Sequence, residues 1–252
     1  LERAGVKAED VDGIICATFT PDSFFPSTAC RIQAKLGCPK AYAFDVSAAC
    51  AGFVYALTIA NGLILSGRGK NVLVIGAEVI SRTLDWTDRT TCILFGDGAG
   101  AVLLQGSMET EAGILSTQLI SDGTQGDILL LPSWGENRTM KMKGNEVFKH
   151  AVRMMSDVSM TVLGDAGFGV DMVDYLIPHQ ANIRIIQAVS ENLKIPKEKV
   201  ITNLEKYGNT SSASIPLALE EAWGKGCIQS GKRVLFTALG GGIVAGGAIV
   251  QF

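Results

Sequence analysis

The sequence contains an internal repeat at a fixed spacing, and this repeat constrains the fold more than any other feature. Three pairs of short motifs share one shift, since 166 − 4, 231 − 69 and 218 − 56 all equal 162. The pairs are Ala4-Gly5 with Ala166-Gly167, Gly69-Lys70 with Gly231-Lys232, and Ala56-Leu57 with Ala218-Leu219. Matches in one ungapped register predict two copies of one supersecondary unit.

Each copy alternates short β-branched runs with helical patterns, which is typical of βαβ units and largely parallel sheets. In the first copy we expect strands at 11–17, 41–46 and 71–77 and helices at 27–36 and 50–65. In the second we expect strands at 173–177, 200–203 and 233–238 and helices at 183–193 and 212–223. Strand and loop at 113–138 and an amphipathic helix at 145–163 precede the second copy.

One helix of each copy carries no charge over most of its length. No charged residue lies between Asp45 and Arg68, and none lies between Thr210 and Glu220. The first stretch is long enough for a membrane span. Asn61 and Gly62 weaken that interpretation, and an all-round apolar helix is also typical of one covered by protein on every side. We therefore expect a layered sandwich in which the two helices pack between two sheets, with no membrane association.

The composition narrows the function classes. A formal net charge of −3 argues against general nucleic-acid binding. The first residues form a charged helix end with no apolar signal-peptide core, and the 6 cysteines include no C-x-x-C pair. These features favour a cytoplasmic protein with reduced thiols. Neither histidine, His150 nor His179, has metal-ligand spacing to the cysteines, so no metal site is expected.

Cys50 is the first candidate for chemistry. It follows the predicted strand at 41–46 and the small-residue turn Ser47-Ala48-Ala49, and it begins an expected helix. A thiol at a helix N-terminus is shifted toward thiolate by the helix dipole. The alternative is a buried cysteine that fills a small space.

Three further segments of the second copy carry candidate groups. His179 follows a predicted parallel strand, at the end where open α/β sheets place their sites, although a structural histidine fits too. Asn209 lies in the loop equivalent to that of Cys50, although asparagine also suits turns and caps. The amides of Gly240-Gly241-Gly242 could bind an oxyanion, or the run could be a flexible turn. His150 is expected to lie at the surface or half-buried.

A glycine-rich segment, Gly96-Asp97-Gly98-Ala99-Gly100, superficially resembles a phosphate loop. It lacks the Lys-Ser/Thr of such loops and a following helix. We therefore expect a hairpin turn.

Together these motifs resemble the β-ketoacyl-acyl carrier protein synthase III family over the whole chain. The order and spacing of Cys, His and Asn make the match specific. The matching segments are 43–53 (AFDVSAACAGF), 95–101 (FGDGAGA), 178–184 (PHQANIR), 207–211 (YGNTS) and 240–242 (GGG).

The resemblance implies a five-layered αβαβα thiolase-like fold, which we divide into halves at 1–112 and 113–252. It also implies a homodimer that condenses an acyl-coenzyme A, through an acyl-Cys50 intermediate, with malonyl-acyl carrier protein to start fatty-acid synthesis. No cofactor is implied. Five Lys/Arg against two Glu between Glu136 and Arg153 favour an acidic partner such as a carrier protein.

The resemblance also assigns site residues. The catalytic Cys, His and Asn fall on Cys50, His179 and Asn209, and the oxyanion-hole amides fall on Cys50 and Gly241. The coenzyme A contacts fall on Arg89, Gly144, Asn145, Phe148 and Asn182. Carrier-protein docking falls on Lys149 and Arg184, and a residue that shapes the partner subunit's acyl pocket falls on Phe25.

The sequence departs from the family pattern in three places. Ile243-Val244-Ala245 follows the glycines where the family has an aromatic or polar group, which affects the acyl tunnel. Glu191 and Asn192 replace two basic docking residues. A family segment that precedes Leu1, with a strand and a Trp and Arg for coenzyme A, is absent. In the second copy an expected strand, within 113–138, precedes the helix that ends at Ala166-Gly167. The first copy has no such strand before the equivalent Ala4-Gly5, so we expect that the chain is incomplete.

Related enzyme classes fit less well. Thiolases need a second cysteine near the last glycine run, and none follows Cys227. Elongating ketosynthases use Cys-His-His, and the third position here is Asn209. Type III polyketide synthases share Cys-His-Asn but differ in the surrounding motifs. Two alternatives stay open: a condensing enzyme of secondary metabolism, and a catalytically idle subunit of the same fold that binds a partner.

Overall fold

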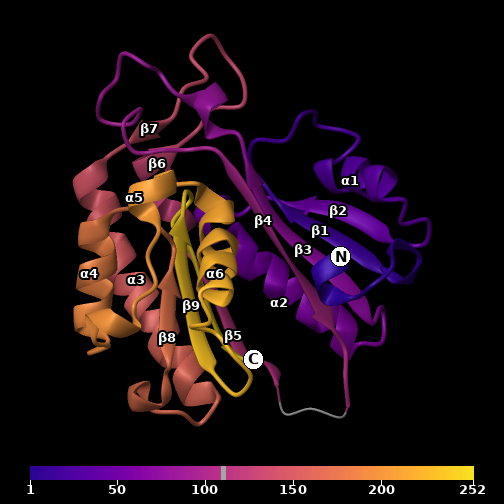
Figure 1. Cartoon of the computed structure of the whole chain (residues 1–252). Coiled ribbons are helices and arrows are strands. Elements are labelled where there is room, and N and C mark those ends of the chain that lie inside the picture. The colour runs from indigo at the N-terminus through magenta and orange to yellow at the C-terminus, as the bar shows by residue number, and fades with distance from the viewer. Residues whose placement is uncertain (109–111) are drawn as a thin grey trace.

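The computed structural model describes residues 1–108 and 112–252, which form two four-stranded sheets and a small two-stranded one (Figure 1). The first sheet has the order β2 (Tyr42–Val46), β1 (Gly13–Ala17), β3 (Asn71–Glu78) and β4 (Gly98–Gln105), and only β4 is antiparallel to its neighbour. The second has the order β5 (Gly113–Ser121), β10 (Val244–Gln251), β9 (Arg233–Gly240) and β8 (Tyr175–Pro178). The short strands β6 (Leu129–Leu130) and β7 (Lys141–Met142) pair with each other.

Helices connect and cover these sheets. The α-helices are α1 (Thr28–Leu36), α2 (Gly52–Leu65), α3 (Gly144–Asp165), α4 (Ile183–Asn192), α5 (Leu204–Tyr207) and α6 (Ser214–Gly224). The 3-10 turns η3 (Ala49–Ala51) and η8 (Ser211–Ala213) precede α2 and α6. Further 3-10 turns span Glu2–Ala4, Ala8–Asp10, Ile80–Thr83, Gly123–Ile128, Val170–Met172 and Lys197–Lys199.

The structure confirms the internal repeat. In four pairs of elements the second member begins 162 residues after the first, because 175 − 13, 211 − 49, 214 − 52 and 233 − 71 give the same shift. The pairs are β1 with β8, η3 with η8, α2 with α6, and β3 with β9. β4 and β10 are also equivalent, since β4 pairs antiparallel with β3 and β10 pairs antiparallel with β9. Among the strands described for the first sheet, none corresponds to β5.

Alternating side chains on the strands place the helices in layers. Ile15 of β1 joins a buried cluster with α2, whereas Ile14 joins a different cluster with α1. In the same way Phe236 of β9 packs toward α2 and α6, and Leu235 packs toward α3 and α4. Because successive strand residues face opposite sides of a sheet, the layers run α1, sheet, α2 with α6, sheet, α3 with α4. The five-layered αβαβα arrangement is therefore confirmed.

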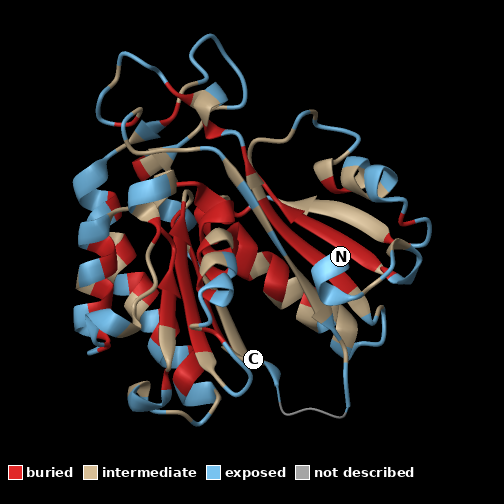
Figure 2. Ribbon diagram, in the orientation of Figure 1, coloured by how far each residue is buried: buried red, intermediate tan, exposed pale blue. Residues whose placement is uncertain are grey.

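The two helices with few charges share the central layer. Residues of α2 and of α6 belong to one buried cluster between the sheets, and Figure 2 shows the buried segments gathered along both sheets and α2. Burial of the first turns of both helices explains why charged residues are absent from those turns. No helix in the described part of the chain is long and apolar enough to cross a membrane.

The start of α1 is tied to the end of β2. The Ser27 hydroxyl accepts a hydrogen bond from the Cys30 N–H, and the Asp45 carboxylate accepts from the N–H groups of Thr28 and Ala29, at 2.8 Å each. These bonds satisfy free donors at the helix N-terminus. They also hold β2 in place beside the loop that carries Cys50.

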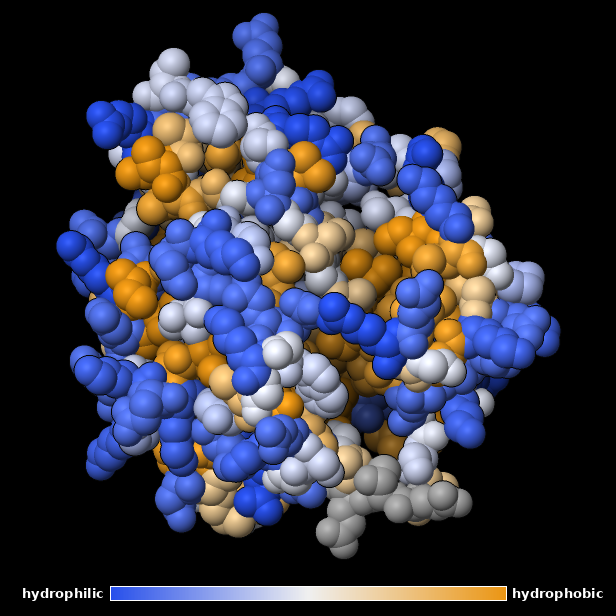
Figure 3. Space-filling view, viewed as in Figure 1, coloured by the Kyte–Doolittle hydropathy of each residue, from blue (hydrophilic) through white to orange (hydrophobic). Residues whose placement is uncertain are grey.

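Apolar atoms reach the surface over the face of this sheet that α1 covers in part (Figure 3).

The expected strand at 200–203 is wrong. Only one bridge forms, between Val200 and Leu176, and α5 begins soon after it. The Gln180 side chain replaces the missing ladder, since its Nε2 donates to the Ile201 carbonyl at 3.4 Å and its Oε1 accepts from the Asn203 N–H at 3.0 Å. A side chain that takes these backbone groups leaves none for a longer pairing.

The expected hairpin turn at 96–100 is also wrong. Gly98 and Gly100 lie within β4, and residues 79–97 form a long connection from β3. A Cβ on Gly98 would lie 2.9 Å from Leu217 Cδ1, and one on Gly100 would lie 2.9 Å from Pro216 Cβ. Glycine is therefore required here because α6 packs closely on the strand, and not because the chain turns.

Candidate active site

Cys50 lies in the 3-10 turn η3, between the carboxyl end of β2 and the start of α2. Ala49 before it has a φ of 45°, a value that non-glycine residues rarely adopt and that turns the chain sharply. Gly52 lets the start of α2 approach β1, since a Cβ there would lie 3.1 Å from Ala17 Cβ. The Cys50 side chain is buried, and the Ser211 hydroxyl donates to its Sγ at 3.3 Å.

The expectation that Cys50 readily forms thiolate is not met by the isolated protein. Burial raises the pKa of the Cys50 thiol to about 12, and the nearby Glu78 carboxyl raises it as well. The hydrogen bond from Ser211 lowers it and only partly offsets burial. The thiol is thus protonated at neutral pH, and α2 begins two residues beyond it rather than at it.

His179 directly follows β8 and is buried. Its N–H donates to the Thr237 carbonyl at 2.8 Å, which holds the backbone against β9. Its ring Nδ1 lies 2.7 Å from Ser214 Oγ, and this oxygen also accepts from the Gln180 N–H. The Ser214 hydrogen is then free to donate to Nδ1, which favours a proton on Nε2. Burial lowers the pKa of His179 to about 3, so the ring is neutral.

Asn209 lies between α5 and η8 and is held on both sides by the backbone. Its N–H donates to the Leu94 carbonyl at 2.9 Å, and its own carbonyl accepts from the Gly96 N–H at 2.9 Å. The side-chain Oδ1 accepts from the Ser211 N–H at 2.9 Å. Since Oδ1 is occupied within the loop, the Asn209 amide group is left to donate through Nδ2.

The glycine run after β9 packs against the Cys50 turn. A Cβ on Gly240 would lie 2.7 Å from the Cys50 nitrogen, and one on Gly241 would lie 3.1 Å from the Leu129 carbonyl oxygen. Gly242 has a φ of 79°. Only glycine allows this turn to approach so closely, which brings its backbone beside the Cys50 amide.

These groups meet at a cavity of about 470 Å³. Cys50, His179 and Asn209 line it together, although they come from three distant segments. Gly144, Asn145, Phe148, Asn182 and Arg184 line it as well. The remaining wall is mainly apolar and comes from Leu94, Phe95, Leu129, Met142, Val147, Ala151, Met155, Ala181, Ile185 and Leu239, with Thr90.

Four predicted site residues do not line the cavity. Gly241 lies in the turn behind Cys50, and Arg89 is exposed next to Thr90, which does line the cavity. Lys149 is exposed on α3 beside Phe148. Phe25 is 87% exposed on the loop between β1 and α1. His150 is half-buried, as expected.

Sequence reasoning missed the polar groups that hold the site. It gave no role to Ser211, which contacts the Cys50 sulfur, to Ser214, which contacts His179, or to the buried Glu78. One signal was available, because serines that begin an uncharged helix must find hydrogen-bond partners once the helix is buried. In the described residues no group of three or more His, Cys, Asp or Glu is arranged to hold a metal.

Comparisons with known proteins give one consistent result. The family model for 3-oxoacyl-[acyl-carrier-protein (ACP)] synthase III matches residues 44–123, and its C-terminal companion matches residues 163–252. The β-ketoacyl-[acyl-carrier-protein] synthase III of Aquifex aeolicus is 51% identical over 252 residues, which are 100% of this chain and 80% of that protein. The enzyme of the same name from Xanthomonas oryzae pv. oryzae is 49% identical, over 100% of this chain and 80% of that protein.

Solved structures agree. The crystal structure of 3-oxoacyl-[acyl-carrier-protein] synthase III from Aquifex aeolicus has a TM-score of 0.97 at 50% identity, covering 100% of this chain and 80% of that one. The Thermus thermophilus enzyme has a TM-score of 0.95 at 42% identity, covering 100% and 81%. The priming β-ketosynthase of the R1128 polyketide pathway is less similar, at 35% identity and a TM-score of 0.94, covering 100% and 78%. The higher identity to the fatty-acid enzymes does not favour the secondary-metabolism alternative.

Proposed function

Because the chain belongs to the 3-oxoacyl-[acyl-carrier-protein] synthase III family, and is thus a condensing acyltransferase of fatty-acid synthesis, we propose that Cys50, His179 and Asn209 carry out its reaction. The proposed reaction condenses an acyl-coenzyme A with malonyl-acyl carrier protein, with loss of carbon dioxide. The observation that supports this assignment most is that the three side chains line one cavity. Every step below uses protein side chains and backbone amides alone.

The first step transfers the acyl group to the enzyme. The Cys50 thiolate attacks the thioester carbonyl of acyl-coenzyme A, and a carbon–sulfur bond to Cys50 replaces the bond to coenzyme A. The proton that leaves Sγ ends on the departing coenzyme A sulfur. The backbone N–H groups of Cys50 and Gly241 stabilise the oxyanion, which the close packing of the glycine turn on the Cys50 amide supports.

The second step generates and uses a carbanion. His179 Nε2–H and Asn209 Nδ2–H donate to the thioester oxygen of the malonyl group, because each residue has its other side-chain polar atom bonded within the protein. Loss of carbon dioxide then leaves an enolate that both donors stabilise. The enolate carbon attacks the acyl carbonyl on Cys50, and the Cys50 thiolate leaves. The neutral ring of His179 can donate from Nε2 because its Nδ1 accepts from the Ser214 hydroxyl.

The mouth of the cavity is the proposed route for coenzyme A. Gly144, Asn145 and Phe148 line the cavity from the first five residues of α3, and Asn182 lines it from the N-cap of α4. Free N–H groups at a helix N-terminus favour anionic ligands. Arg89 is exposed beside Thr90 at the same cavity and supplies a positive charge.

The same mouth is the proposed docking face for the acyl carrier protein. Arg184 lines the cavity and is exposed on α4, and Lys149 is exposed on α3 next to Phe148, which also lines the cavity. Basic side chains around an opening steer an acidic partner toward it. Glu191 and Asn192 lie at the other end of α4, so they do not interrupt this pair.

Assembly and location belong to the same proposal. An aromatic side chain that is 87% exposed, as Phe25 is, fits a homodimer in which it reaches the partner subunit's acyl pocket. The proposed halves, 1–112 and 113–252, correspond to the two sheets, since β4 belongs to the first and β5 to the second. A cytoplasmic location is proposed because the 6 cysteines are free thiols.

Three variants test the assignment. Cys50→Ala should form no acyl-enzyme by intact mass but retain some decarboxylation of malonyl-acyl carrier protein, because different groups serve the two steps. His179→Ala and Asn209→Ala should still acylate at Cys50 and lose condensation by at least about a hundredfold, the scale of one oxyanion donor. Cys38→Ala is the matched control, since this buried thiol lies in a different cluster.

Any of three results would contradict the proposal. Acylation of the Cys50→Ala chain would place the nucleophile elsewhere. Condensation at the parental rate by the His179 or Asn209 variant would remove the enolate-stabilising role. If the parent chain, without any substitution, neither forms an acyl-enzyme nor decarboxylates malonyl-acyl carrier protein, the alternative of a catalytically idle subunit is favoured.

A further inference from the structure

The 3-10 turns η3 and η8 occupy equivalent positions in the two halves, and a hydrogen bond joins them. The Ser211 hydroxyl, at the start of η8, donates to Cys50 Sγ at 3.3 Å. Ser211 is fully buried, with 0% of its surface exposed. Its φ of 51° matches the φ of 45° at the equivalent Ala49, so both turns adopt the same uncommon backbone. The position that is Ser211 in η8 is Ala49 in η3. Of these two equivalent residues, Ser211 is therefore the one that brings a hydroxyl to the sulfur.

The backbone on each side of this hydroxyl is held. The Ser211 N–H donates to Asn209 Oδ1 at 2.9 Å. The next residue, Ser212, has its Oγ at 2.8 Å from the Ala17 carbonyl oxygen and at 3.0 Å from Glu78 Oε1. The η8 turn of the second half is therefore anchored to the end of β1 and to the end of β3 in the first half.

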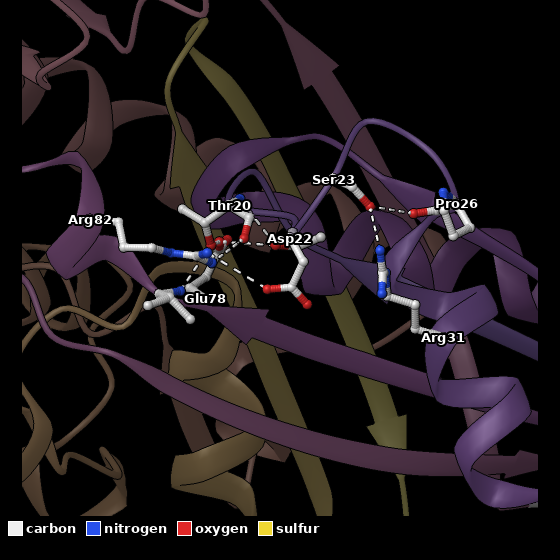
Figure 4. Close-up of polar contacts among 9 residues, drawn as sticks. Thr20, Asp22, Ser23, Pro26, Arg31, Glu78 and Arg82 are labelled. Atoms are coloured by element: carbon white, nitrogen blue, oxygen red, sulfur yellow. Dashed lines mark hydrogen bonds and ion pairs between the residues drawn. The ribbon is translucent and has the colours of Figure 1, made fainter.

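Glu78 is a buried carboxyl, 3% exposed, whose two oxygens have different partners. Its Oε2 accepts from the Thr20 hydroxyl at 2.6 Å, the Phe19 N–H at 3.2 Å and the Thr18 hydroxyl at 3.3 Å. Its Oε1 faces Ser212. The surroundings of Glu78, with Thr20, are drawn in Figure 4.

The charged neighbours of Glu78 do not form an ion pair with it. Arg82 donates instead to the Thr20 carbonyl at 3.1 Å and lies 3.6 Å from Asp22 (Figure 4). The Ser212 hydroxyl has one proton for two oxygens, those of Ala17 and Glu78. Both are satisfied together if Glu78 is protonated on Oε1 and donates to Ser212 while Ser212 donates to Ala17.

We propose that Ser211 is a further catalytic residue, whose hydroxyl stabilises the Cys50 thiolate, and that Ser212 and Glu78 are positioning residues that hold it there. The inference rests on the proposed function, in which Cys50 is the nucleophile. The thiolate occurs twice in the cycle, once before it attacks the acyl-coenzyme A and once when the product leaves. At both points a buried sulfur anion is costly without a hydrogen-bond donor.

The size of the effect follows from two opposing terms. Loss of a hydrogen bond to a charged group lowers the thiolate fraction by about ten- to a hundredfold. The remaining thiolate is more basic and therefore more nucleophilic. On a logarithmic scale, this gain in reactivity offsets about half of the loss in thiolate fraction. The net expectation is that the rates of Cys50 acylation and alkylation fall by about three- to tenfold.

The test compares Ser211→Ala and Ser211→Gly with the control Ser159→Ala. Ser159 is also 0% exposed, and its hydroxyl donates to the Met155 carbonyl of its own helix. The rate of iodoacetamide alkylation at Cys50 is measured from about pH 6 to about pH 10, together with acyl-enzyme formation by intact mass and malonyl decarboxylation. Ser211→Ala and Ser211→Gly should lower the rate of Cys50 alkylation by the same factor at every pH. Both variants should slow acylation in proportion and retain decarboxylation. Ser159→Ala should change none of these.

Ser212→Ala tests the positioning role. It keeps the Ser211 hydroxyl and removes the anchor to Glu78, so it should slow acylation by less than Ser211→Ala does and alter the alkylation curve in the same direction.

The outcomes separate this inference from the proposed function. Alkylation and acylation that do not occur at Cys50 overturn the proposed function. Modification at Cys50 with an unchanged alkylation curve in Ser211→Ala overturns the inference alone. Glycine removes the hydroxyl but accepts a φ of 51° without strain. A slow Ala variant beside a parental Gly variant would therefore assign the effect to the backbone, and this too would overturn the inference.

Discussion

Glu78 and His179 should make opposite contributions to the pH dependence of stability, and replacing Glu78 by Gln should reveal this. Burial raises the pKa of Glu78 from 4.5 to about 7. A carboxyl with a raised pKa binds its proton more tightly in the folded protein. The stability that it contributes is therefore complete below pH 4.5 and is lost as the pH rises through about 7.

His179 has the reverse sign. Burial lowers its pKa from 6.5 to about 3, so the unfolded chain takes up the proton first. The stability that neutral His179 contributes is complete above pH 6.5 and is lost as the pH falls toward about 3. The two pH windows overlap between 4.5 and 6.5. From about pH 5 to about pH 8 the stability that Glu78 contributes falls while that from His179 rises, so the two residues oppose each other.

The magnitudes nearly cancel. Between about pH 5 and about pH 8, ionisation of Glu78 should lower the free energy of unfolding by about 2.5 kcal/mol, at about 1.4 kcal/mol per pKa unit. Over the same range, His179 should raise it by about 2 kcal/mol. The parent chain should therefore be almost insensitive to pH from these two groups. Glu78→Gln should become about 2 kcal/mol more stable at about pH 8 than at about pH 5.

Urea unfolding at the two pH values measures this, and the quantity of interest is the difference between parent and variant. Other titrating groups are common to both chains and cancel. Glu221→Gln is the control, since hydrogen bonds lower the pKa of Glu221 and keep its titration below this range. If Glu78→Gln shows the same pH profile as the parent, Glu78 is ionised at neutral pH and the reasoning on its proton is wrong.

Two further predictions concern the docking face and the packing behind the site. Arg184→Glu should raise the KM for the carrier-protein substrate more than that for acyl-coenzyme A in steady-state kinetics, and added salt should reproduce this in the parent. Arg68→Glu, a charge reversal at an exposed residue in the turn after α2, is the control. Equal effects of Arg184→Glu on both substrates would move Arg184 into the coenzyme A site. Gly76→Ala should lower the free energy of unfolding by about 1–3 kcal/mol in urea titration, because the new Cβ would lie 2.2 Å from the Ser212 carbonyl oxygen. Gly62→Ala, whose Cβ would meet nothing within 4 Å, should cost nothing, and equal stability of the two variants would contradict the packing.

Much of the fold could be predicted because its causes are local or repeated. The shift of the repeat located equivalent strands and helices, and the uncharged stretches that form α2 and the first part of α6 indicated their central layer. The errors occurred where a distant side chain decided the local structure. Gln180 takes the backbone groups of residues 201–203, and close packing by α6 accounts for the glycines of β4. Neither effect leaves a pattern in the segment that it changes.

The site shows the same limit in a more consequential form. The resemblance could indicate Cys50 because its segment carries a recognisable motif, but the thiol's chemistry depends on groups 161 and 28 residues away, Ser211 and Glu78. Position 212 is the repeat equivalent of Cys50, since 212 − 50 is 162. The duplication therefore brought two turns of one backbone shape together, and their side chains then diverged. One turn carries Cys50, the proposed nucleophile, and the other carries the Ser211 hydroxyl that contacts its sulfur and the Ser212 hydroxyl that contacts Glu78. A pattern search compares each turn with its copy, whereas the chemistry arises from the contact between the copies, which only the folded chain provides.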